Sequence, residues 1–578
     1  MGPALVSDFL IPELKFIDLS RAQEGFVDFG LCETKPNRSE AFRMRSPSLN
    51  GKGDEENRFG EVAASPNSQN LTESGIKAGI EEIDVLFLFG VGDEPLHRSL
   101  STWLKKEEGR FLVFIEEREE FFLRGKNLPF ASDPGVRFFY WKRGDEAIFQ
   151  RIAWEFVFLR FGYAVSEPHF KGAAQDFFIL LEHYHRGVDL LGSDSEDMGI
   201  KVLSNVMENL SLLPKARLGS SLEGKCAGIP AIICGAGPSL DHAAPLLSAL
   251  KEKALMIGGG SSVRALNAHG ISPHIFASID PHPPYRRFLE QECFEIPFFY
   301  QGRFCHSLLE RVQAPLVLMP DSGSYPLEGW LAAEFDIFAE CFDAGWTVAN
   351  FCTSLAAHLG CSPIILIGMD FSCGPTDIYA SKIGGEENRN ALIELKKDTL
   401  YSKRDWLMSA EWTGSFAKKN PHIQWINASR DGIDLPGIEY RELSEVAEIM
   451  LTGEFDMAGI VHALIHGASP SQVSSEKVDN VRKKVKESFK KCLEICDGLL
   501  KVWEKHYPDS PLERGEYAIL DIEFEQQICY RHFLLPLWNV WKHPILRTTL
   551  HPLGQHLHRL LFFKKAIEMH LPHLRSFS

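Results

Sequence analysis

Six short apolar runs between residues 231 and 426 limit what the middle of this chain can fold into. Each run is rich in Ile, Leu, Val or Phe and has the length of a buried β-strand. Helical or loop segments separate most of the runs, which predicts parallel strands joined by crossovers. The runs are residues 231–234, 254–257, 274–279, 315–319, 363–367 and 423–426. We therefore expect an α/β fold with a doubly wound, Rossmann-like central domain over residues 215–440.

A smaller copy of this pattern comes earlier in the chain. An apolar run over 85–90 ends in Gly90-Val91-Gly92, a helix follows from Glu94, and further runs cover 111–115 and 136–141. The pattern predicts a small Rossmann-like domain at residues 81–165. A glycine turn followed by an acid at the end of the next strand is compatible with ribose binding, as in methyltransferases. We favour a tight structural turn instead, because one Gly-x-Gly is a common strand ending.

The remaining parts of the chain divide by composition. Residues 1–80 are interpreted as an N-terminal segment with a flexible linker, since 34–80 are polar and poor in large apolar side chains. A helical connector is expected at 166–214. A helical C-terminal domain is expected at 441–578, with helices near 476–505, 512–538 and 553–570.

Composition excludes several classes of partner. The net charge of −17 argues against a broad electrostatic grip on nucleic acid or on an anionic membrane. No apolar run reaches the length of a membrane span, and the start of the chain lacks the basic residues of a signal peptide. The twelve cysteines contain no CxxC pair, so we expect reduced thiols and a cytoplasmic protein.

The C-terminal region is rich in histidine, which raises the question of a metal site. The spacing of these histidines matches no common zinc pattern, so we expect no metal there and interpret the side chains as exposed or packed in the core. The residues concerned are His551, His556, His558, His570 and His573.

The loop after the first central strand carries the strongest functional signal. Its residues are Gly235, Ala236, Gly237, Pro238 and Ser239, followed by Leu240 and Asp241. The glycines allow a sharp turn and a close approach of the backbone to a ligand. Free N–H groups at the start of the following helix, together with the helix dipole, form an anion site that suits phosphate. The loop lacks the third glycine of the dinucleotide fingerprint and the Gly-Lys-Ser/Thr of a Walker loop.

Other strand ends on the same edge add ligand-like residues. The second strand ends in glycines up to Gly260, followed by Ser261, and the third ends at Asp280. Gly345 and Thr347 precede a helix for which Thr347 is the expected N-cap, and this helix should bury Phe351, Leu355 and Leu359 and end at Gly360. The following strand ends at Asp370. These residues predict one nucleotide site at the carboxyl edge of the sheet.

At this point the sequence resembles the motility accessory factor (Maf) family of glycosyltransferases. The resemblance covers most of residues 81–440 and is strongest at 229–283 and 345–372. The small N-terminal domain is similar to the one that precedes the core in that family. The matching motifs are Ile232–Asp241, Ser278–Pro281, Gly345–Ala349, Leu366–Asp370 and Ile426–Ser429, in the family's order.

The resemblance implies a specific activity. Maf enzymes transfer a nonulosonic, sialic-acid-like sugar from a CMP donor to Ser or Thr of flagellin. By this similarity, 235–239 would hold the CMP phosphate and ribose, Gly260, Ser261 and Asp280 would line the nucleotide, and Gly345, Thr347 and Asp370 would close the site. Asn427 is assigned to the nucleotide in the same way. The implied partners are a nucleotide-sugar donor and a protein acceptor, with no tightly bound cofactor.

The sequence departs from related sialyltransferases at the catalytic base. Those enzymes carry a histidine after the strand that matches 366–370, and here no histidine occurs between Phe371 and Pro421. Asp280 and Asp370 are the catalytic candidates by position, although orienting the nucleotide is an alternative role for both. Other candidates to assist at the phosphate or the acceptor are Tyr379, Lys382 and Asp398. No Asp-x-Asp occurs in the core loops, so the sequence does not require a metal.

Two alternatives stay open. The same superfamily contains MptE-like hydroxymethylpterin diphosphokinases, which carry similar loops and use ATP with Mg²⁺. The domains on either side of the core favour the Maf branch. The second alternative is a non-catalytic nucleotide-binding scaffold of the same fold, which the missing histidine favours and the intact glycine loop does not.

Overall fold

A computed structural model describes residues 83–574 of the chain, apart from several short segments. The segments outside the description are 93, 108, 167–170, 286–287, 289–291, 321–325, 338–341, 376, 382, 384–391, 395–399, 431, 508–510 and 547–551. The predicted N-terminal segment 1–80 lies outside the described residues. The described chain forms two compact units. The small unit holds residues 83–194 and 539–555, and the large unit holds 195–538 and 556–574. The five parts of the chain expected from the sequence, with their boundaries, stay predictions.

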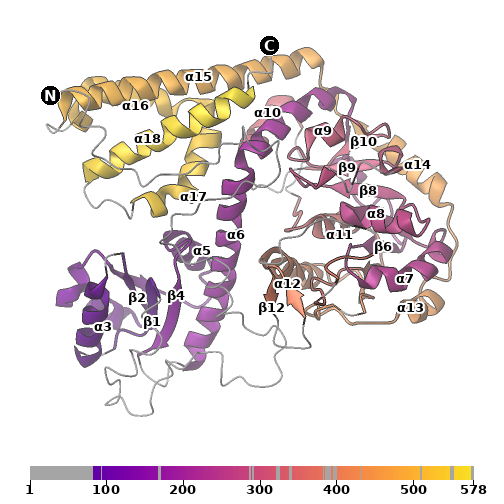
Figure 1. The fold of residues 1–578 in the computed structure, drawn as a ribbon, viewed down its shortest axis with the longest axis horizontal. Coiled ribbons are helices and arrows are strands. Elements are labelled where there is room, and N and C mark those ends of the chain that lie inside the picture. The colour runs from indigo at the N-terminus through magenta and orange to yellow at the C-terminus, as the bar shows by residue number, and fades with distance from the viewer. Residues whose placement is uncertain are drawn as a thin grey trace. The chain divides into compact units, whose positions relative to one another are not determined.

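The small unit contains a four-stranded parallel sheet in the order β3-β2-β1-β4 (Figure 1). Its strands are β1 (Val85–Phe89), β2 (Phe111–Glu116), β3 (Val136–Tyr140) and β4 (Phe161–Val165). The helices between them are α3 (Glu94–Lys106), α4 (Glu119–Lys126) and α5 (Ala147–Glu155). The strands β1, β2 and β3 confirm the three strands predicted from the sequence, whereas β4 was not predicted.

Both faces of this small sheet are covered. Along β1, Phe87 and Phe89 pack into an aromatic core with residues of α5, while Leu86 and Leu88 pack with Leu96 of α3 on the other face. A strand that is buried on both faces must be apolar at every position, which explains the unbroken apolar run of β1.

A single long helix, α6 (Lys171–Asn209), follows the small sheet. It is the helix expected between residues 166 and 214. A 3₁₀ turn over Leu210–Lys215 ends it, where Pro214 cannot continue the α-helical hydrogen bonds.

The large unit is built on a nine-stranded sheet in the order β14-β11-β6-β7-β8-β9-β10-β5-β15. Its neighbouring strands are parallel except for β15, which pairs antiparallel with β5. The strands are β5 (Arg217–Leu218), β6 (Ala231–Cys234), β7 (Leu255–Gly259), β8 (Ile275–Ser278), β9 (Phe298–Tyr300), β10 (Leu316–Leu318), β11 (Ile364–Ile367), β14 (Trp425–Asn427) and β15 (Ser469–Pro470). All six predicted strands are present, so the α/β fold class is confirmed.

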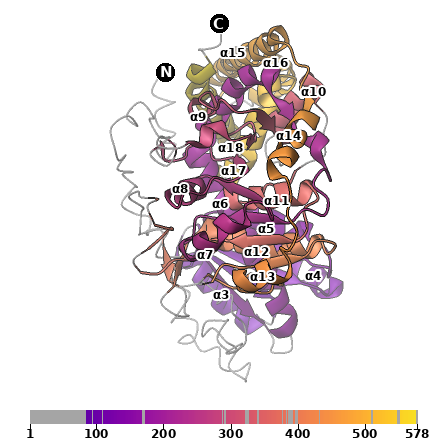
Figure 2. The same ribbon diagram turned by 90° about the vertical axis from the view of Figure 1, so that its right-hand side faces the viewer.

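Helices cover the two faces of the large sheet. One face packs into a core with α7 (Ser239–Leu247), α8 (Ser261–Ala268) and α13 (Leu443–Ile449). Figure 2 shows α7 and α13 side by side on this face. The helix α11 (Val348–His358) packs against β6, β7 and β8, and next to it runs α12 (Arg404–Lys419). The helical segment α11 buries Phe351, Leu355 and Leu359, as the sequence predicted.

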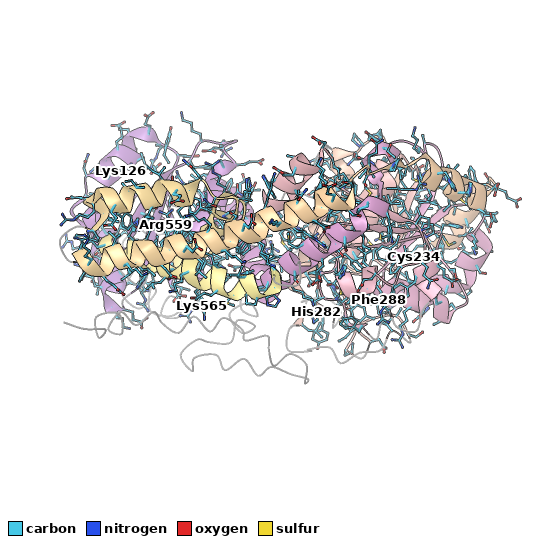
Figure 3. All side chains as sticks on the ribbon, turned by 90° about the horizontal axis from the view of Figure 1, so that it is seen from above. Lys126, Cys234, His282, Phe288, Arg559 and Lys565 are labelled. Carbon is cyan, nitrogen blue, oxygen red and sulfur yellow. The ribbon has the colours of Figure 1, made fainter. Side chains whose placement is uncertain are left out.

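The C-terminal region is helical, as expected. Its helices are α14 (Met457–Gly467), α15 (Ser475–His506), α16 (Gly515–Glu525), α17 (Leu535–Leu546) and α18 (Pro552–His570). The single helix expected near 512–538 is interrupted after Glu525 by a turn and by a π-helical segment, Tyr530–Leu534. Arg559 of α18, labelled in Figure 3, donates to the hydroxyl of Tyr530 at 2.6 Å, which fixes this segment to α18.

The C-terminal histidines within the described chain pack as core or half-buried residues. His570 Nδ1 donates to the carbonyl of Ala566 (2.7 Å), and His556 contacts the hydroxyl of Tyr517 (2.6 Å). Burial lowers the pKa of His556 and of His570 to about 4, so both rings are neutral at pH 7. His551 lies outside the described residues.

Nine cysteines have described side chains, and all nine are buried free thiols. No helix among the described residues is long and apolar enough to cross a membrane.

Candidate functional site

The order of strands in the large sheet places a switch point between β6 and β11. After β6 the chain adds β7, β8, β9 and β10 in sequence on one side, and then returns to place β11 on the other side of β6. In open α/β sheets the connections diverge at such a point, and ligands bind outside the carboxyl ends of the strands there. The loops that follow β6 and β11 therefore form the middle of the candidate site.

These two loops are in direct contact through their backbones. The amide of Gly235 donates to Ile367 O at 2.7 Å, and the amide of Gly237 donates to Gly368 O at 2.8 Å. A Cβ atom at Gly235 would clash with the carbonyl oxygen of Gly368, and one at Gly237 would clash with the carboxylate of Asp370. Glycine is thus required at both positions by the neighbouring loop, which is a second reason for glycine besides the expected approach of a ligand.

The N-terminus of α7 already holds a carboxylate. Pro238 precedes the helix, and the amide of Ser239 donates to Asp370 Oδ2 at 2.9 Å while the hydroxyl of Ser239 donates to Oδ1. Ser239 and Asp370 are 3% and 2% exposed, so this contact is buried. The carboxylate of Asp370 occupies the anion position that the sequence analysis gives to a phosphate. The nucleotide role of Ser239 and the catalytic role of Asp370 stay predictions.

A further loop packs over the glycine turn. The amide of Ala380 donates to Ala236 O at 2.9 Å, and Ser381 donates to Asp241 from its amide (2.6 Å) and its hydroxyl (2.9 Å). Asp241 also contacts His269 Nε2 at 2.9 Å. Burial alone would raise the pKa of Asp241, but these hydrogen bonds from His269 and Ser381 outweigh it and hold the pKa below its usual value.

Asn427 lies behind the loop that follows β11. Its side-chain oxygen accepts from the amide of Ser429 at 3.0 Å, and the hydroxyl of Ser429 accepts from the amide of Met369 at 2.9 Å. Asn427 is 5% exposed. The pair therefore supports the turn that carries Asp370, and contact of Asn427 with a nucleotide stays a prediction.

The end of β7 meets the beginning of α11. Gly260 has a left-handed φ of 55°, and Ser262 holds the turn by hydrogen bonds to Gly259 N (3.0 Å) and Gly259 O (2.9 Å). A Cβ at Gly259 would clash with Val348 and with the carbonyl of Ala277. The first residue of α11 thus lies directly against Gly259 and Gly260.

The N-terminus of α11 is built as the sequence predicted. Thr347 is the N-cap and forms a capping box with Asn350, whose side chain is fully buried and also donates to Thr413 Oγ1 at 3.0 Å. Gly345 has a φ of 62° and lies against Asn350. Within the described chain, the amides of Val348 and Ala349 have no hydrogen-bond partner. They leave two N–H groups and the positive end of a helix dipole for an anion.

Asp280 lies beyond the end of β8 and is partly exposed. Its carboxylate accepts from the amide of His282 at 2.9 Å, and its carbonyl accepts from the amide of Cys305 at 3.2 Å. Figure 3 labels His282 and also Cys234, at the end of β6. Asp280 is a partly exposed acid at the carboxyl edge of the sheet.

Two asparagines of α6 brace the loops after β8 and β9, and the sequence analysis missed both. Asn205 donates to Pro281 O (2.9 Å) and to Arg303 O (3.1 Å). Asn209 donates to Gly302 O (2.8 Å) and to Phe304 O (2.7 Å). Both side chains are at least 96% buried. Two asparagines four residues apart on the apolar face of a helix were the available signal, because a buried amide needs several partners.

The other candidates to assist at the phosphate or the acceptor are placed only in part. Tyr379 packs edge-on against Trp406 with ring centroids 5.8 Å apart, and Lys403 Nζ lies 5.5 Å from the Tyr379 ring. Lys382 and Asp398 lie outside the described residues, so their roles stay predictions.

In the small unit, the glycine turn is structural. The carboxylate of Glu116 is fully buried, accepts from the amide of Val91 at 3.2 Å and is paired with Arg118 at 2.8 Å. Both carboxylate oxygens of Glu116 accept hydrogen bonds from groups of the protein. This supports the interpretation of the glycine turn as a tight structural turn and not as a ribose site. Asp93, at the end of this turn, lies outside the described residues.

The fold and this edge of the sheet define a doubly wound α/β protein with a switch-point site. Residues 204–375 match the family model described as 6-hydroxymethylpterin diphosphokinase MptE-like. The fold is that of a solved MAf glycosyltransferase from Magnetospirillum magneticum AMB-1, with a TM-score of 0.50 and 16% identity. That match covers 89% of this chain and 86% of the other. A comparison with curated proteins found no match. The chain therefore contains an MptE-like domain within a Maf-like fold, as the sequence resemblance indicated.

Proposed function

We propose that this protein is a Maf-like glycosyltransferase that moves a nonulosonic sugar from a CMP donor to a Ser or Thr hydroxyl of a protein, in the cytoplasm. The observation that carries the proposal is the extent of the shared fold. The MptE-like match covers only residues 204–375, whereas the likeness to the MAf glycosyltransferase covers 89% of the chain. The parts on either side of the core thus favour the glycosyltransferase.

The chemistry of the transfer assigns roles to the candidate site. The acceptor oxygen forms a bond to the anomeric carbon while the bond from that carbon to the phosphate oxygen breaks, and CMP leaves with the electron pair. The free amides of Val348 and Ala349, at the N-terminus of α11, would stabilise the departing phosphate. Preorganised N–H groups of this kind contribute roughly 3–4 kcal/mol each to a transition state.

The proton of the acceptor hydroxyl needs a base within hydrogen-bond reach. Asp280 is our candidate, because it is partly exposed and lies beyond the end of β8. Asp370 is the weaker candidate, since Ser239 donates to both of its carboxylate oxygens. We assign Asp370 the role of holding the glycine loop against the loop after β11.

A second candidate function is an MptE-like diphosphokinase that passes a diphosphate from ATP to a pterin alcohol. The family match over 204–375 supports it. The Mg²⁺ of that reaction would be held by one or two carboxylates together with the substrate phosphates, and Asp280 is the acid best placed to contribute.

A thermal-shift series on the full chain separates these candidates. The ligands are CMP, CMP-sialic acid, ATP with Mg²⁺, and S-adenosylmethionine. A ligand at about 100 times its Kd stabilises the folded state by about 2.7 kcal/mol, so we expect a clear shift with CMP and CMP-sialic acid. Asp280→Ala should weaken the shift, whereas Glu454→Ala, which changes an exposed acid before α14, should not.

The other outcomes decide against the transferase. A shift with ATP and Mg²⁺ alone would establish the diphosphokinase. A response to S-adenosylmethionine alone would indicate that the ligand binds at the small sheet and not at the large one. No response to any of the four compounds would leave the non-catalytic scaffold as the function.

A further inference from the structure

Two histidines on the helix α14 form a pair that the candidate site does not use. His462 and His466 are four residues apart, and both are exposed. Their ring centroids are 4.1 Å apart, with an angle of 43° between the ring planes. Residues four apart on a helix lie on the same face, one turn from each other. The two imidazoles therefore contact each other directly at the surface of α14.

The spacing of this pair is rare in the sequence. The chain has 21 histidines, and His462 and His466 are the one pair separated by four residues. Helical zinc motifs use the same spacing to place two histidines on one metal ion. The described histidines of the C-terminal region are buried or half-buried instead. The pair on α14 thus combines the spacing and the exposure that a metal ion requires.

Both rings have a nitrogen available for a ligand. Neither His462 nor His466 has a hydrogen bond or an ion pair to another described residue, and their ring contact is with each other. A neutral imidazole carries one nitrogen lone pair, which accepts a hydrogen bond or binds a metal ion. A metal ion at this pair would therefore displace only water.

The separation of the rings is close to what one shared ion requires. Zn²⁺ binds histidine nitrogens at about 2.0–2.1 Å, with tetrahedral angles between its ligands. Two nitrogens bound to the same ion are then about 3.3 Å apart. Rings whose centroids are 4.1 Å apart are already in van der Waals contact, so small rotations of the side chains reach this geometry.

The surroundings on α14 leave room for an ion and its other ligands. The exposed residues beside the pair include Ala463 and Gly467, whose side chains are small or absent. Leu464 and Ile465 are buried, so a different face of the helix packs on the protein. His466 also lies in the last turn of α14, where the negative end of the helix dipole favours a cation.

The two ligands select a class of metal. Imidazole suits Zn²⁺, Ni²⁺ and Cu²⁺, whereas Mg²⁺ and Ca²⁺ take oxygen ligands. Among the described residues, no group of three or more His, Cys, Asp and Glu side chains could hold a metal ion. The pair therefore supplies two ligands, and water supplies the others.

We infer that His462 and His466 form a surface site for a divalent transition metal ion such as Zn²⁺, Ni²⁺ or Cu²⁺. The site is independent of the proposed transferase function, because no residue assigned to that function belongs to α14. Figure 1 shows α14 at the outer side of the large unit. A bound ion would fix the last turn of this helix, directly before β15 joins the edge of the sheet at β5.

Retention of the untagged full chain on a Ni²⁺-charged resin tests the site. We expect the wild type to be retained, and His462→Ala and His466→Ala to elute with little delay, since a single imidazole holds the ion much more weakly than two. Both residues are exposed and alanine favours helices, so the variants should fold. His422→Ala is the matched control, because His422 is exposed and has no histidine four residues away. Its retention should equal that of the wild type.

Calorimetry with Zn²⁺ measures the affinity of the same variants. We expect either single variant to lose about tenfold in affinity relative to the wild type. Mg²⁺ at the same concentration should give no signal that depends on the two histidines. Because the ion binds the folded helix, Zn²⁺ should also raise the melting temperature of the wild type more than that of either variant.

Two results would overturn the inference. Equal retention of the wild type and of both single variants would show that other groups of the chain bind the nickel. Failure of the wild type to bind Ni²⁺ and Zn²⁺ would show that the two rings pack together without holding an ion. Neither result bears on the proposed function, which is tested separately by the response to nucleotides.

Discussion

The four-stranded sheet and the nine-stranded sheet of this protein share a local arrangement, but a different neighbouring strand supplies its acid in each. In each sheet a strand ends in Gly-x-Gly, and a buried acid from a neighbouring strand accepts an amide of that turn. In the small sheet the acid is Glu116, which accepts from Val91, and in the large sheet it is Asp370, which accepts from Ser239. The sequence motif alone does not distinguish them.

The difference lies in the order of the strands. Glu116 ends β2, but the strand order of the small sheet reverses between β1 and β4. The acid of the small sheet is therefore not at the reversal. It forms an ion pair with Arg118. Asp370 follows β11, and the large sheet reverses between β6 and β11. Both glycine turns follow the strand at the reversal, β1 in the small sheet and β6 in the large one. The acid comes from across the reversal only in the large sheet, and this is the difference between the structural turn and the centre of the candidate site.

The largest expected effect tests the contact across the reversal. Gly235→Ala would drive a Cβ into the carbonyl of Gly368, and we expect a loss of about 3 kcal/mol in the free energy of unfolding. Urea denaturation measures it. The control is Gly329→Ala in the helix α10 (Pro326–Phe335), where a Cβ meets no atom within 4 Å and stability should stay level or rise. Equal stability of Gly235→Ala and the wild type would show that the two loops do not constrain each other.

A smaller effect is expected at the corresponding acid of the small sheet. Arg118→Met leaves the fully buried carboxylate of Glu116 without its cation. Because Arg118 is itself 32% exposed, we expect a loss of about 2 kcal/mol, below the full value for a buried pair. The thermal shift with CMP should not change, since this acid is assigned no ligand.

The control for this variant is an exposed pair of the same kind. Arg441→Met removes the partner of Glu439 at the surface and should leave stability unchanged. A weaker response to CMP in Arg118→Met would mean that the small sheet takes part in nucleotide binding, and the contrast between the sheets would fail.

The smallest effect concerns an unpaired group inside the small unit. His185 is 1% exposed, neither ring nitrogen has a partner, and the ring stacks on Phe161 at 4.5 Å. His185→Phe removes two unpaired nitrogens from an aromatic core, so we expect a gain of about 1 kcal/mol at pH 7 by thermal or urea unfolding.

The same residue predicts a dependence on pH. Burial lowers the pKa of His185 to about 3, below the unfolded value of about 6.5. The folded state therefore excludes a proton that the unfolded state binds, so stability is complete above pH 6.5 and falls as the pH drops from 6.5 to about 3. His185→Phe should reduce this fall, whereas the exposed His422→Phe should not. Identical slopes in His185→Phe and the wild type would contradict the assignment.

Much of the fold could be predicted because strands buried on both faces are unbroken apolar runs. The strands that escaped prediction lack that signal. In β4, Gly162 and Ala164 alternate with aromatic residues and every side chain is only half-buried. In β9 the run is three residues long, and β5 and β15 have two residues each.

The contacts around the candidate site could be predicted only in part. Glycines, a capping threonine and acids at strand ends mark the edge, and the N-cap at Thr347 is confirmed. The partner of Ser239 is 131 residues away, so no local pattern links it to Asp370. Asn205 and Asn209 were missed because the contribution of a buried amide to stability depends on the groups that surround it in three dimensions.

The position of β11 between β6 and β14 has a consequence for the growing chain. The strand β6 is complete at Cys234, but its neighbour on that side begins only at Ile364. At roughly 5–20 residues per second, a ribosome needs on the order of ten seconds to make the intervening segment. During that interval an apolar strand edge stays open to other chains. Binding by a chaperone would be most useful to the nascent protein in this interval.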